Sequence, residues 1–268
     1  MAKLCDKFWV WGHPEGRYNY EFGNNANSRM TPMEGALYMG ARNMFMVPVG
    51  VDLSWRQYNK SFVTLKNVGW CLDNTGAGPD QPINPQLIDK LIEEARDFPN
   101  ITCGVFDDFN NYLAAHKDTK PDMFHEFRER MHNNSVRPLD MWMVLYTQEF
   151  GLDEQRDKDF QPFIDAFDGV IMWTWKASDL KLFEEKYAKF KQMTANKRRM
   201  LGLYLYNFGE NKKASGKDAL WQLERYTELL KAGEIEGIVL HSNTMADLDH
   251  EAYDVERAWM ALHGDEEI

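Results

Sequence analysis

The segment Ile101-Thr-Cys-Gly-Val-Phe-Asp107-Asp108 contains an apolar run that stops at two adjacent carboxylates. A strand with apolar residues at nearly every position is typical of a parallel sheet, in which both faces are covered. In α/β folds, ligands bind at the carboxyl ends of such strands. The segment therefore predicts a buried parallel strand, and it makes Asp107 and Asp108 the first candidates for a functional site.

Strand-like and helix-like stretches alternate on both sides of this segment. We expect strands over residues 7–12, 43–49, 68–72, 101–106, 139–146, 169–175, 199–206 and 235–241. We expect helices from Thr31-Pro32 onward and over residues 55–65, 86–97, 122–133, 157–167, 178–197, 216–232 and 249–263. Eight consecutive strand–helix units predict an α/β protein with a single (β/α)8 TIM barrel, whose active site lies on the loops after the strands. A doubly wound open sheet is the alternative, although the sequence lacks a Gly-rich phosphate loop.

The length and composition agree with one such barrel. A chain of 268 residues suits a single domain over residues 1–268. The net charge of −11 argues against a nucleic-acid partner, because binding to phosphate backbones normally needs a basic face. No apolar run approaches the roughly 20 residues that span a bilayer, so we expect no membrane partner either. The aromatic content of 13% suits stacking on sugar rings, although core packing explains most of these residues.

The cysteines and histidines do not predict a metal or redox site. Cys5, Cys71 and Cys103 lack the spacing of zinc or redox motifs, so we expect them to be reduced and buried. No cysteine or carboxylate lies at ligand spacing from His13, from His241 or from the pair His125 and His132, so we expect no metal and no cofactor. The first residues lack an apolar segment of signal-peptide length, which indicates the cytoplasm if this start is native and export if a signal peptide was removed.

Carboxylates, amides and tryptophans dominate the ends of the expected strands. These residues include His13, Asp73, Tyr146, Glu149, Trp173, Trp175, Asn207 and Asn243. Such side chains suit a ligand with hydroxyl and amide groups, whereas a phosphate-binding barrel would show Gly and cationic groups after its last two strands. Adjacent acids raise the pKa of one member, so that one can donate a proton near neutral pH while the other stays ionised. This division suits glycosidic-bond cleavage; the alternative is one Asp that caps the loop and another that is merely solvated.

Phe106-Asp-Asp-Phe109 is similar to the Phe-Asp-Asp-Ile segment of the family 84 glycoside hydrolases, the O-GlcNAcase and hyaluronidase-like β-N-acetylglucosaminidases. Four further segments resemble that family in the same order, each at the end of a later strand. They are Thr147-Gln-Glu149-Phe150 (Thr-Glu-Tyr in the family), Met172-Trp-Thr174 (Met-Trp-Thr-Gly), Tyr206-Asn207-Phe208 (Trp-Asn-Phe/Tyr-Pro-Val-Asn-Asp) and Ser242-Asn243-Thr-Met245 (Ser-Asn-Pro-Met). The resemblance covers the second half of the chain better than the first.

The chain also departs from the family pattern. Val47-Pro-Val-Gly50 stands where the family has Ala-Pro-Lys-Asp-Asp, so the lysine is absent. Gly209-Glu-Asn211 lacks the Asp that follows strand seven, and Phe150 lacks the hydroxyl of the matching Tyr. These losses affect sugar contacts, so the resemblance bears more on the class of reaction than on the exact substrate.

The resemblance implies a β-N-acetylhexosaminidase-like glycoside hydrolase that acts on a carbohydrate or glycoconjugate. In this family the 2-acetamido oxygen of the substrate attacks the anomeric carbon, so no enzymic nucleophile is needed. Asp107 would orient the acetamido N–H, and Asp108 would protonate the leaving oxygen and then act as base on water. Asn207 and Asn243 would hydrogen-bond the sugar, with loop capping as the competing role.

The other candidates leave alternatives open. At most one of Trp173 and Trp175 is expected to line the pocket. The other tryptophan is expected to pack in the core. Glu149 together with an Asp would instead make an ordinary retaining or inverting glycosidase that acts on a sugar without an acetamido group. The missing lysine and Asp also allow a carbohydrate-binding barrel without turnover.

Overall fold

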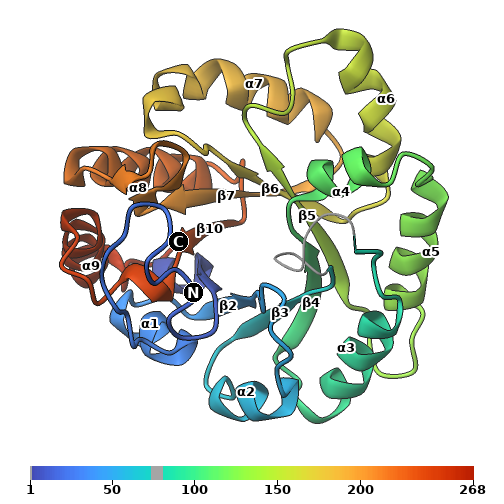
Figure 1. Ribbon diagram of the computed structural model, residues 1–268, viewed down its shortest axis with the longest axis horizontal. Helices are drawn as coiled ribbons and strands as arrows, with labels where there is room; N and C mark the ends of the chain where they lie inside the picture. The colour runs from blue at the N-terminus through green and yellow to red at the C-terminus, as the bar shows by residue number, and fades with distance from the viewer. Residues whose placement is uncertain (1, 74–80) are drawn as a thin grey trace. The chain divides into compact units, whose positions relative to one another are not determined.

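The computed structural model describes residues 2–73 and 81–268, and its main strands form a closed barrel. Neighbouring strands follow the order β1, β10, β7, β6, β5, β4, β3 and β2. The paired strands are parallel, and each barrel strand leads into a helical segment (Figure 1). The predicted (β/α)8 fold is confirmed, and the alternative of an open sheet is wrong.

The bounds of the elements follow the expected alternation. The barrel strands are β1 (Phe8–Gly12), β2 (Asn43–Met46), β3 (Asn67–Cys71), β4 (Ile101–Phe106), β5 (Asp140–Tyr146), β6 (Gly169–Trp173), β7 (Arg198–Tyr204) and β10 (Gly237–His241). The α-helices are α1 (Pro32–Tyr38), α2 (Trp55–Ser61), α3 (Gln86–Asp97), α4 (Phe109–Ala115), α5 (Pro121–His132), α6 (Glu154–Asp165), α7 (Phe183–Met193), α8 (Gly216–Lys231) and α9 (Glu251–His263). Short 3-10 helices span Leu4–Lys7, Ala177–Leu182, Phe208–Glu210 and Asn243–Met245.

Several local expectations were wrong. The expected strand 43–49 ends at Met46, and the expected helix 178–197 is a 3-10 helix followed by the shorter α7. No helix was expected directly after β4, but α4 begins there. Two consecutive Asn residues interrupt the apolar spacing that would have predicted this helix. The expected strand 199–206 ends early, and Tyr206–Asn207 (β8) instead pairs with Lys212–Lys213 (β9) in a small antiparallel hairpin. The expected strand 169–175 ends at Trp173, which leaves Trp175 in the following loop.

The described chain consists of two compact units. The first comprises Met1–Val47, Trp173–Phe183 and Met200–Ile268. It contains β2, β1, β10 and β7 as adjacent strands, and α8 packs against α9 and β10. Trp11 of β1 lies opposite Phe45 on β2 and His241 on β10 in the strand register, so these residues share one level of the sheet.

The second unit comprises Pro48–Met172 and Glu184–Arg199 and contains β3, β4 and β5. Helix α3 packs on β4, and α5 packs on β5 (Figure 1). Gly104 of β4 permits close packing on this side, because a Cβ there would lie 2.3 Å from Cδ1 of Leu72 and 3.3 Å from Cδ2 of Leu91 on α3. Phe106 ends β4 inside an aromatic cluster with Phe124 and Phe167, which fixes the point from which the Asp pair emerges.

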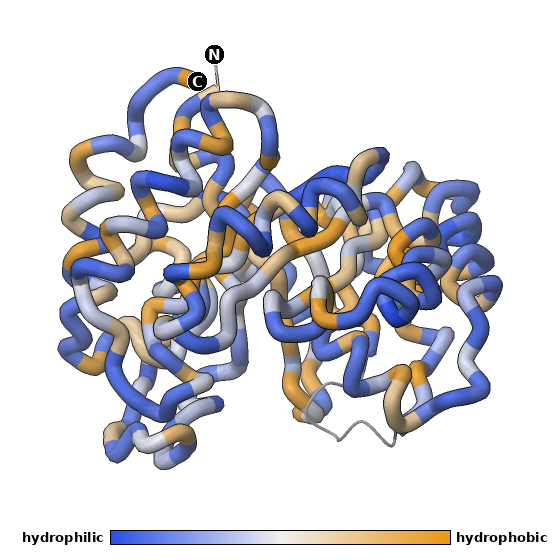
Figure 2. The backbone as a smooth tube through the Cα atoms, turned by 90° about the horizontal axis from the view of Figure 1, so that it is seen from above, coloured by the Kyte–Doolittle hydropathy of each residue, from blue (hydrophilic) through white to orange (hydrophobic). Residues whose placement is uncertain are grey.

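Hydropathy follows the secondary structure. Hydrophilic and hydrophobic residues alternate along the helices in Figure 2, as expected for helices that bury one face. In α3 the buried positions are Ile88, Leu91 and Ala95, whose spacing places them on one face of the helix. None of the helices in the described ranges has the length and apolar character of a membrane span. The three cysteines are buried, as predicted.

Candidate active site

Asp107 and Asp108 follow β4 directly, in the turn that leads into α4. Asp108 is the N-cap residue of α4 and has left-handed backbone angles of φ 45° and ψ 35°. Among residues other than Gly, Asp and Asn adopt this conformation most readily. The backbone N–H of Asp108 donates to Oδ1 of Asp107 over 2.9 Å. The two acids therefore share one sharp turn, and the backbone of one holds the carboxyl group of the other.

Tyr146 and Glu149 bring a second strand end to this pair. The hydroxyl of Tyr146, the last residue of β5, donates to Oδ1 of Asp108 over 3.0 Å. The backbone N–H of Tyr146 donates to Oε2 of Glu149 over 2.8 Å, and the N–H of Glu149 donates to the Tyr146 carbonyl over 2.9 Å. Glu149 thus closes the turn after β5 and holds the residue that bonds Asp108.

Asp73 is a third aspartate in this group. Its Oδ2 accepts a hydrogen bond from the backbone N–H of Asp107 over 2.5 Å, and its Oδ1 accepts one from the Cys71 thiol over 2.9 Å. Cys71 lies opposite Val105 in the parallel register of β3 and β4, so residues just beyond these strands meet. The sequence pattern placed Asp73 at a strand end but gave it no role. Because consecutive strands of such a barrel are neighbours, the position of Asp73 after β3 could have indicated that it lies near Asp107 after β4.

Electrostatic effects raise the pKa values of all three predicted acids. Burial raises the pKa of Asp107 well above its ordinary value, and the charges of Asp108, Asp73 and Glu149 raise it further. Burial also raises the pKa of Asp108, but the hydrogen bond from Tyr146 opposes the rise. The pKa of Glu149 is raised by burial and lowered in part by the N–H of Tyr146.

These causes differ between the members of the pair. The charges of three other carboxylates raise the pKa of Asp107, and the N–H of Asp108 on its carboxylate offsets only part of this rise. On Asp108, the hydroxyl of Tyr146 opposes the effect of burial. The pKa of Asp107 is therefore raised more strongly than that of Asp108, which makes Asp108 the more readily ionised group. A protonated carboxyl beside an ionised one can both donate and accept a proton near neutral pH. Both side chains keep partial solvent exposure, so water or a ligand can reach them.

In the first unit, two hydrogen bonds join Asn243 to the backbone of His13. The backbone N–H of His13 donates to Oδ1 of Asn243 over 2.8 Å, and Nδ2 of Asn243 donates to the carbonyls of His13 and Met30 over 3.0 and 2.8 Å. Asn243 is 0% exposed. Its amide ties the segments after β1 and β10 together, which is the loop-capping role, so we leave it out of the proposed ligand site.

The ring of His13 is also part of the interior. Its Nδ1 lies 2.9 Å from the Val47 carbonyl, so we assign the proton to Nδ1 and the acceptor role to Nε2. That Nε2 lies 3.1 Å from the Tyr18 hydroxyl and 3.5 Å from Nε2 of His241. Burial lowers the pKa of His13 to about 3 and that of His241 well below its ordinary value. Both rings are therefore neutral at neutral pH and supply no cation to a ligand.

Asn207 has a structural role of the same kind. It is 2% exposed, its Nδ2 donates to Oε2 of Glu210 over 2.5 Å, and its Oδ1 accepts the N–H of Ala177 over 3.3 Å. The side chain thereby connects the segment after β6 to the start of the β8–β9 hairpin. As for Asn243, these contacts support the competing loop-capping role.

The two tryptophans differ in accessibility. Trp173 is 1% exposed, and its ring packs against Tyr204 at 4.7 Å and over Gly202, where a Cβ would leave no room. Trp175 lies beyond the end of β6, keeps partial exposure, and stacks on Phe208 with ring centroids 6.1 Å apart. Trp173 is a core residue, and stacking of Trp175 on a sugar stays a prediction.

His132, Asp140 and Asp168 also lie close enough together to hold a metal ion. However, Asp168 pairs with Nε of Arg128 at 2.6 Å and with Nε2 of His132 at 2.9 Å, and Asp140 pairs with Arg198. The group lies at the amino end of β5, away from the carboxyl ends where ligands bind in barrels. Because cationic side chains already accompany both carboxylates, we interpret the group as an ion-pair network.

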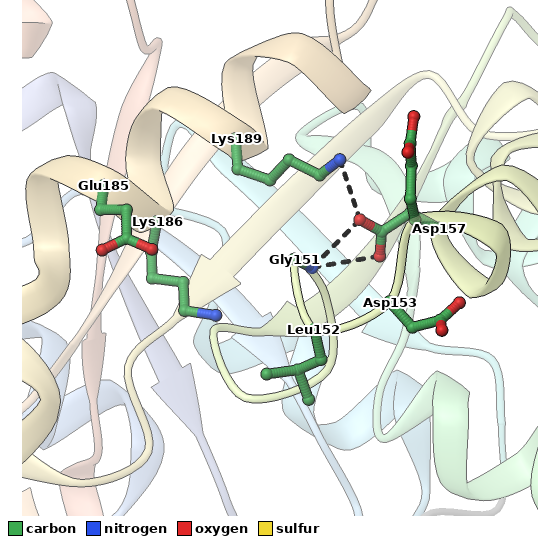
Figure 3. Close-up of a pocket in the computed structure, with 8 residues that line it drawn as sticks. Gly151, Leu152, Asp153, Asp157, Glu185, Lys186 and Lys189 are labelled. Atoms are coloured by element: carbon green, nitrogen blue, oxygen red, sulfur yellow. Dashed lines mark hydrogen bonds and ion pairs between the residues drawn. The ribbon is translucent and has the colours of Figure 1, made fainter.

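A cavity of about 250 Å³ lies between the loop after β5 and helices α6 and α7 (Figure 3). Both carboxyl oxygens of Asp157 accept the backbone N–H of Gly151 over 3.1 Å, and the same carboxylate pairs with Lys189 at 2.9 Å. Lys186 donates to the Phe150 carbonyl over 3.0 Å. These contacts within the lining hold the loop on the helices, so we interpret the cavity as a structural junction.

Comparison with known proteins supports the fold. No family model and no curated protein matches the sequence. The GH99 endo-alpha-mannosidase from Bacteroides thetaiotaomicron is similar in structure, with a TM-score of 0.56, 9% identity and 96% of both chains covered. The xylanase-A-amylase inhibitor protein XAIP-III has a TM-score of 0.53 and 8% identity, over 94% of this chain and 98% of that one. Tryptophan synthase from M. tuberculosis has a TM-score of 0.50 and 12% identity, over 98% and 94%.

These three proteins differ in what their names describe, while their structures resemble this chain over nearly its whole length. At such low identity the likeness shows a common fold, and one barrel fold supports many unrelated activities. The chain is therefore a (β/α)8 barrel protein. Its similarity to family 84 glycoside hydrolases rests on the motifs alone, and its function has to be argued from the acids at the strand ends.

Proposed function

We propose that this protein is a glycoside hydrolase in which Asp107 and Asp108 transfer the protons. The observation that supports this is a pair of adjacent carboxyl groups with raised pKa values and different partners. Cleavage of a glycosidic bond needs one group that gives a proton to the leaving oxygen and one that takes a proton from water. The GH99 endo-alpha-mannosidase carries a glycosidase name on a similar fold, which is compatible with this activity.

In this proposal, protonated Asp107 donates to the glycosidic oxygen as the bond between that oxygen and the anomeric carbon breaks. Ionised Asp108 accepts a hydrogen bond from the reacting group and then takes a proton from the attacking water, which forms the new bond to the anomeric carbon. Proton exchange within the pair then restores the starting state. These roles reverse those implied by the family resemblance, because burial and the neighbouring carboxylates together raise the pKa of Asp107 more strongly than that of Asp108.

We propose a sugar with a 2-acetamido group as the substrate. The order of the five motifs along the chain supports this choice, as does the position of the Asp pair directly after β4. The acetamido oxygen would attack the anomeric carbon while Asp108 accepts a hydrogen bond from the acetamido N–H. The lysine and Asp that this chain lacks would otherwise contact hydroxyl groups, so selectivity for the rest of the sugar would differ from that of family 84.

Leaving-group dependence tests both the activity and the roles. The test compares wild type, Asp107→Asn and Asp108→Asn from pH 4 to 8. Each protein is assayed with two aryl N-acetyl-β-glucosaminides, one with a good leaving group (2,4-dinitrophenol) and one with a poor leaving group (phenol). We expect Asp107→Asn to lose about 100-fold or more with the poor leaving group and far less with the good one, since a good leaving group needs no proton. Asp108→Asn should be slow with both. The exposed Asp118 supplies the control, Asp118→Asn.

Three outcomes would change the proposal. The opposite leaving-group pattern would assign the acid role to Asp108, as the family resemblance implies. A wild type no faster than either variant would contradict the hydrolase. Calorimetric binding of N-acetylglucosamine without turnover would indicate a carbohydrate-binding barrel.

Glu149 supports a second candidate, a glycosidase that acts on a sugar without an acetamido group. Burial raises its pKa, and Tyr146 connects it to Asp108 through the two hydrogen bonds described above. Its Oε2 accepts the N–H of Tyr146, and a hydrogen bond from the Asn110 side chain also lowers its pKa. Under this hypothesis, Glu149→Gln abolishes hydrolysis of aryl glucosides or mannosides, and wild type is inactive on the N-acetyl compounds.

A further inference from the structure

We propose that Asp73 is a positioning residue of this site: its carboxylate anchors the turn after β4 and places a further carboxylate beside Asp107. The inference rests on the proposed function of Asp107 and Asp108 as a proton-transfer pair. It gives a role to an acid that the sequence motifs do not include.

The contacts of Asp73 reach the backbone of the pair itself. Its Oδ2 accepts the N–H of Asp107 over 2.5 Å, at the residue where β4 ends and the sharp turn begins. Asp107 then accepts the N–H of Asp108 through its own Oδ1. The two bonds form a chain in which each carboxylate fixes the backbone of the next acid. Movement of Asp73 would therefore move both members of the pair.

Two hydrogen bonds to Asp73 suit an ionised carboxylate. The N–H of Asp107 and the thiol of Cys71 are donors, and each approaches a different oxygen. Burial, together with the charges of Asp73 and Asp107, raises the pKa of Cys71 well above its ordinary value, so this thiol keeps its proton and remains a donor. A thiolate in that place would instead repel the carboxylate.

The charges around Asp107 come from the ends of three strands. Asp73 follows β3, Asp108 follows β4, and Glu149 lies in the turn after β5. Arg156 offsets part of the charge of Glu149. Asp73 differs from the other acids because it acts on Asp107 both through its charge and through a hydrogen bond to the backbone.

Two variants separate the charge from the anchor. Asp73→Asn keeps an oxygen that can accept the N–H of Asp107 but removes the charge, whereas Asp73→Ala removes both. The control Asp118→Asn makes the same change of charge at an exposed position of the same unit. Protonation of individual carboxyls is followed by NMR of protein labelled with ¹³C at the Asp carboxyl carbon, with Asp107→Asn and Asp108→Asn used to assign the two signals.

We expect the wild-type signal of Asp107 to stay protonated to higher pH than that of Asp108. In Asp73→Asn the midpoint of Asp107 should fall by about one pH unit, because one neighbouring negative charge is gone, and Asp118→Asn should leave it unchanged. Asp73→Ala should in addition broaden or shift the signals of Asp108, because the turn loses its anchor. If the protein hydrolyses aryl glycosides, the pH profile of Asp73→Asn should shift in the same direction with little change in KM.

An unchanged Asp107 midpoint in folded Asp73→Asn would overturn the proposal. Loss of the fold in both Asp73 variants, with a folded control, would also overturn it, since Asp73 would then be a purely structural residue. The NMR measurement does not need turnover. An inactive wild type would contradict the hydrolase while the titration still decides the role of Asp73.

Discussion

The hydroxyl of Tyr146 donates a hydrogen bond of 3.0 Å to Oδ1 of Asp108, and so links the end of β5 to the acid pair after β4. This bond favours the ionised form of Asp108 and lowers its pKa against the effect of burial. It is the contact that most clearly separates the two members of the pair.

Tyr146→Phe should therefore raise the pKa of Asp108. If ionised Asp108 acts as the base, the acidic limb of the kcat/KM profile should move upward by about 0.5 to 1 pH unit, because more base is protonated at a given pH. The exposed Tyr20 provides the control, Tyr20→Phe. An acidic limb that stays in place in Tyr146→Phe would argue against Asp108 as the base.

Replacing Asp108 should affect stability as well as activity. Asp107 and Asp108 have raised pKa values, so the folded protein loses stability as pH rises above about 4, where the unfolded acids ionise first. Asp108→Asn removes one of these charges and tolerates the left-handed backbone, so its thermal midpoint should exceed that of wild type, more at pH 8 than at pH 5. Asp108→Ala should be less stable than Asp108→Asn by about 1 kcal/mol, because Ala resists this conformation. Equal thermal midpoints for the two variants would contradict the backbone argument.

Glu256 on α9 should make the protein sensitive to alkaline pH. It is 0% exposed, and within the described residues neither of its carboxyl oxygens has a hydrogen-bond partner. Burial raises its pKa well above the ordinary value, with partial relief from Arg257. The folded state therefore holds a proton that the unfolded state releases, and stability falls as pH rises above about 4.5, by up to ~1.4 kcal/mol per pH unit.

Urea unfolding of Glu256→Gln from pH 4.5 to 8 checks this expectation. The variant should show a flatter dependence than wild type and should be the more stable protein at pH 8. Glu224→Gln, at an exposed position of α8, should follow the wild-type curve. Parallel curves for wild type and Glu256→Gln would show that Glu256 has an ordinary pKa.

The buried histidines should control stability on the acid side. The pKa of His13 is lowered from 6.5 to about 3, and that of His241 is also lowered well below 6.5, in both cases mainly by burial. The unfolded chain takes up these protons first, so their contribution is complete above pH 6.5 and is lost as pH falls toward 3. His241→Phe removes one titrating ring from an aromatic cluster, so it should flatten this decline. Denaturation at pH 7.5 and pH 5 measures the effect, and a steeper decline than wild type would contradict it.

The strands and helices were largely predictable because their apolar patterns are local. The expected strand 101–106 coincides with β4, and the expected helix 86–97 coincides with α3. Helix α4 was missed because two Asn residues interrupt its short apolar pattern. The hairpin β8–β9 was missed because its strands have two residues each, too few for a period-2 pattern.

The site was predictable in part. The sequence placed Asp107, Asp108 and Glu149 at strand ends, where the structure links them through hydrogen bonds. The sequence did not reveal that the side-chain amides of Asn207 and Asn243 form hydrogen bonds with the backbone of loops. An Asn after a strand can bind a ligand or stabilise a loop equally well. Such a choice depends on the loops that surround the side chain, and these come from distant parts of the chain.

The left-handed backbone at Asp108 restricts which sequences can carry this site. Only Asp, Asn and Gly adopt that conformation readily, and of these only Asp supplies a carboxylate. A genome search could therefore require Asp-Asp directly after the fourth barrel strand and a further Asp two residues after the third, the place that Asp73 holds here. Such a positional signature would distinguish proteins with this arrangement of acids from barrels that share only the fold, such as those similar to this chain at 8 to 12% identity.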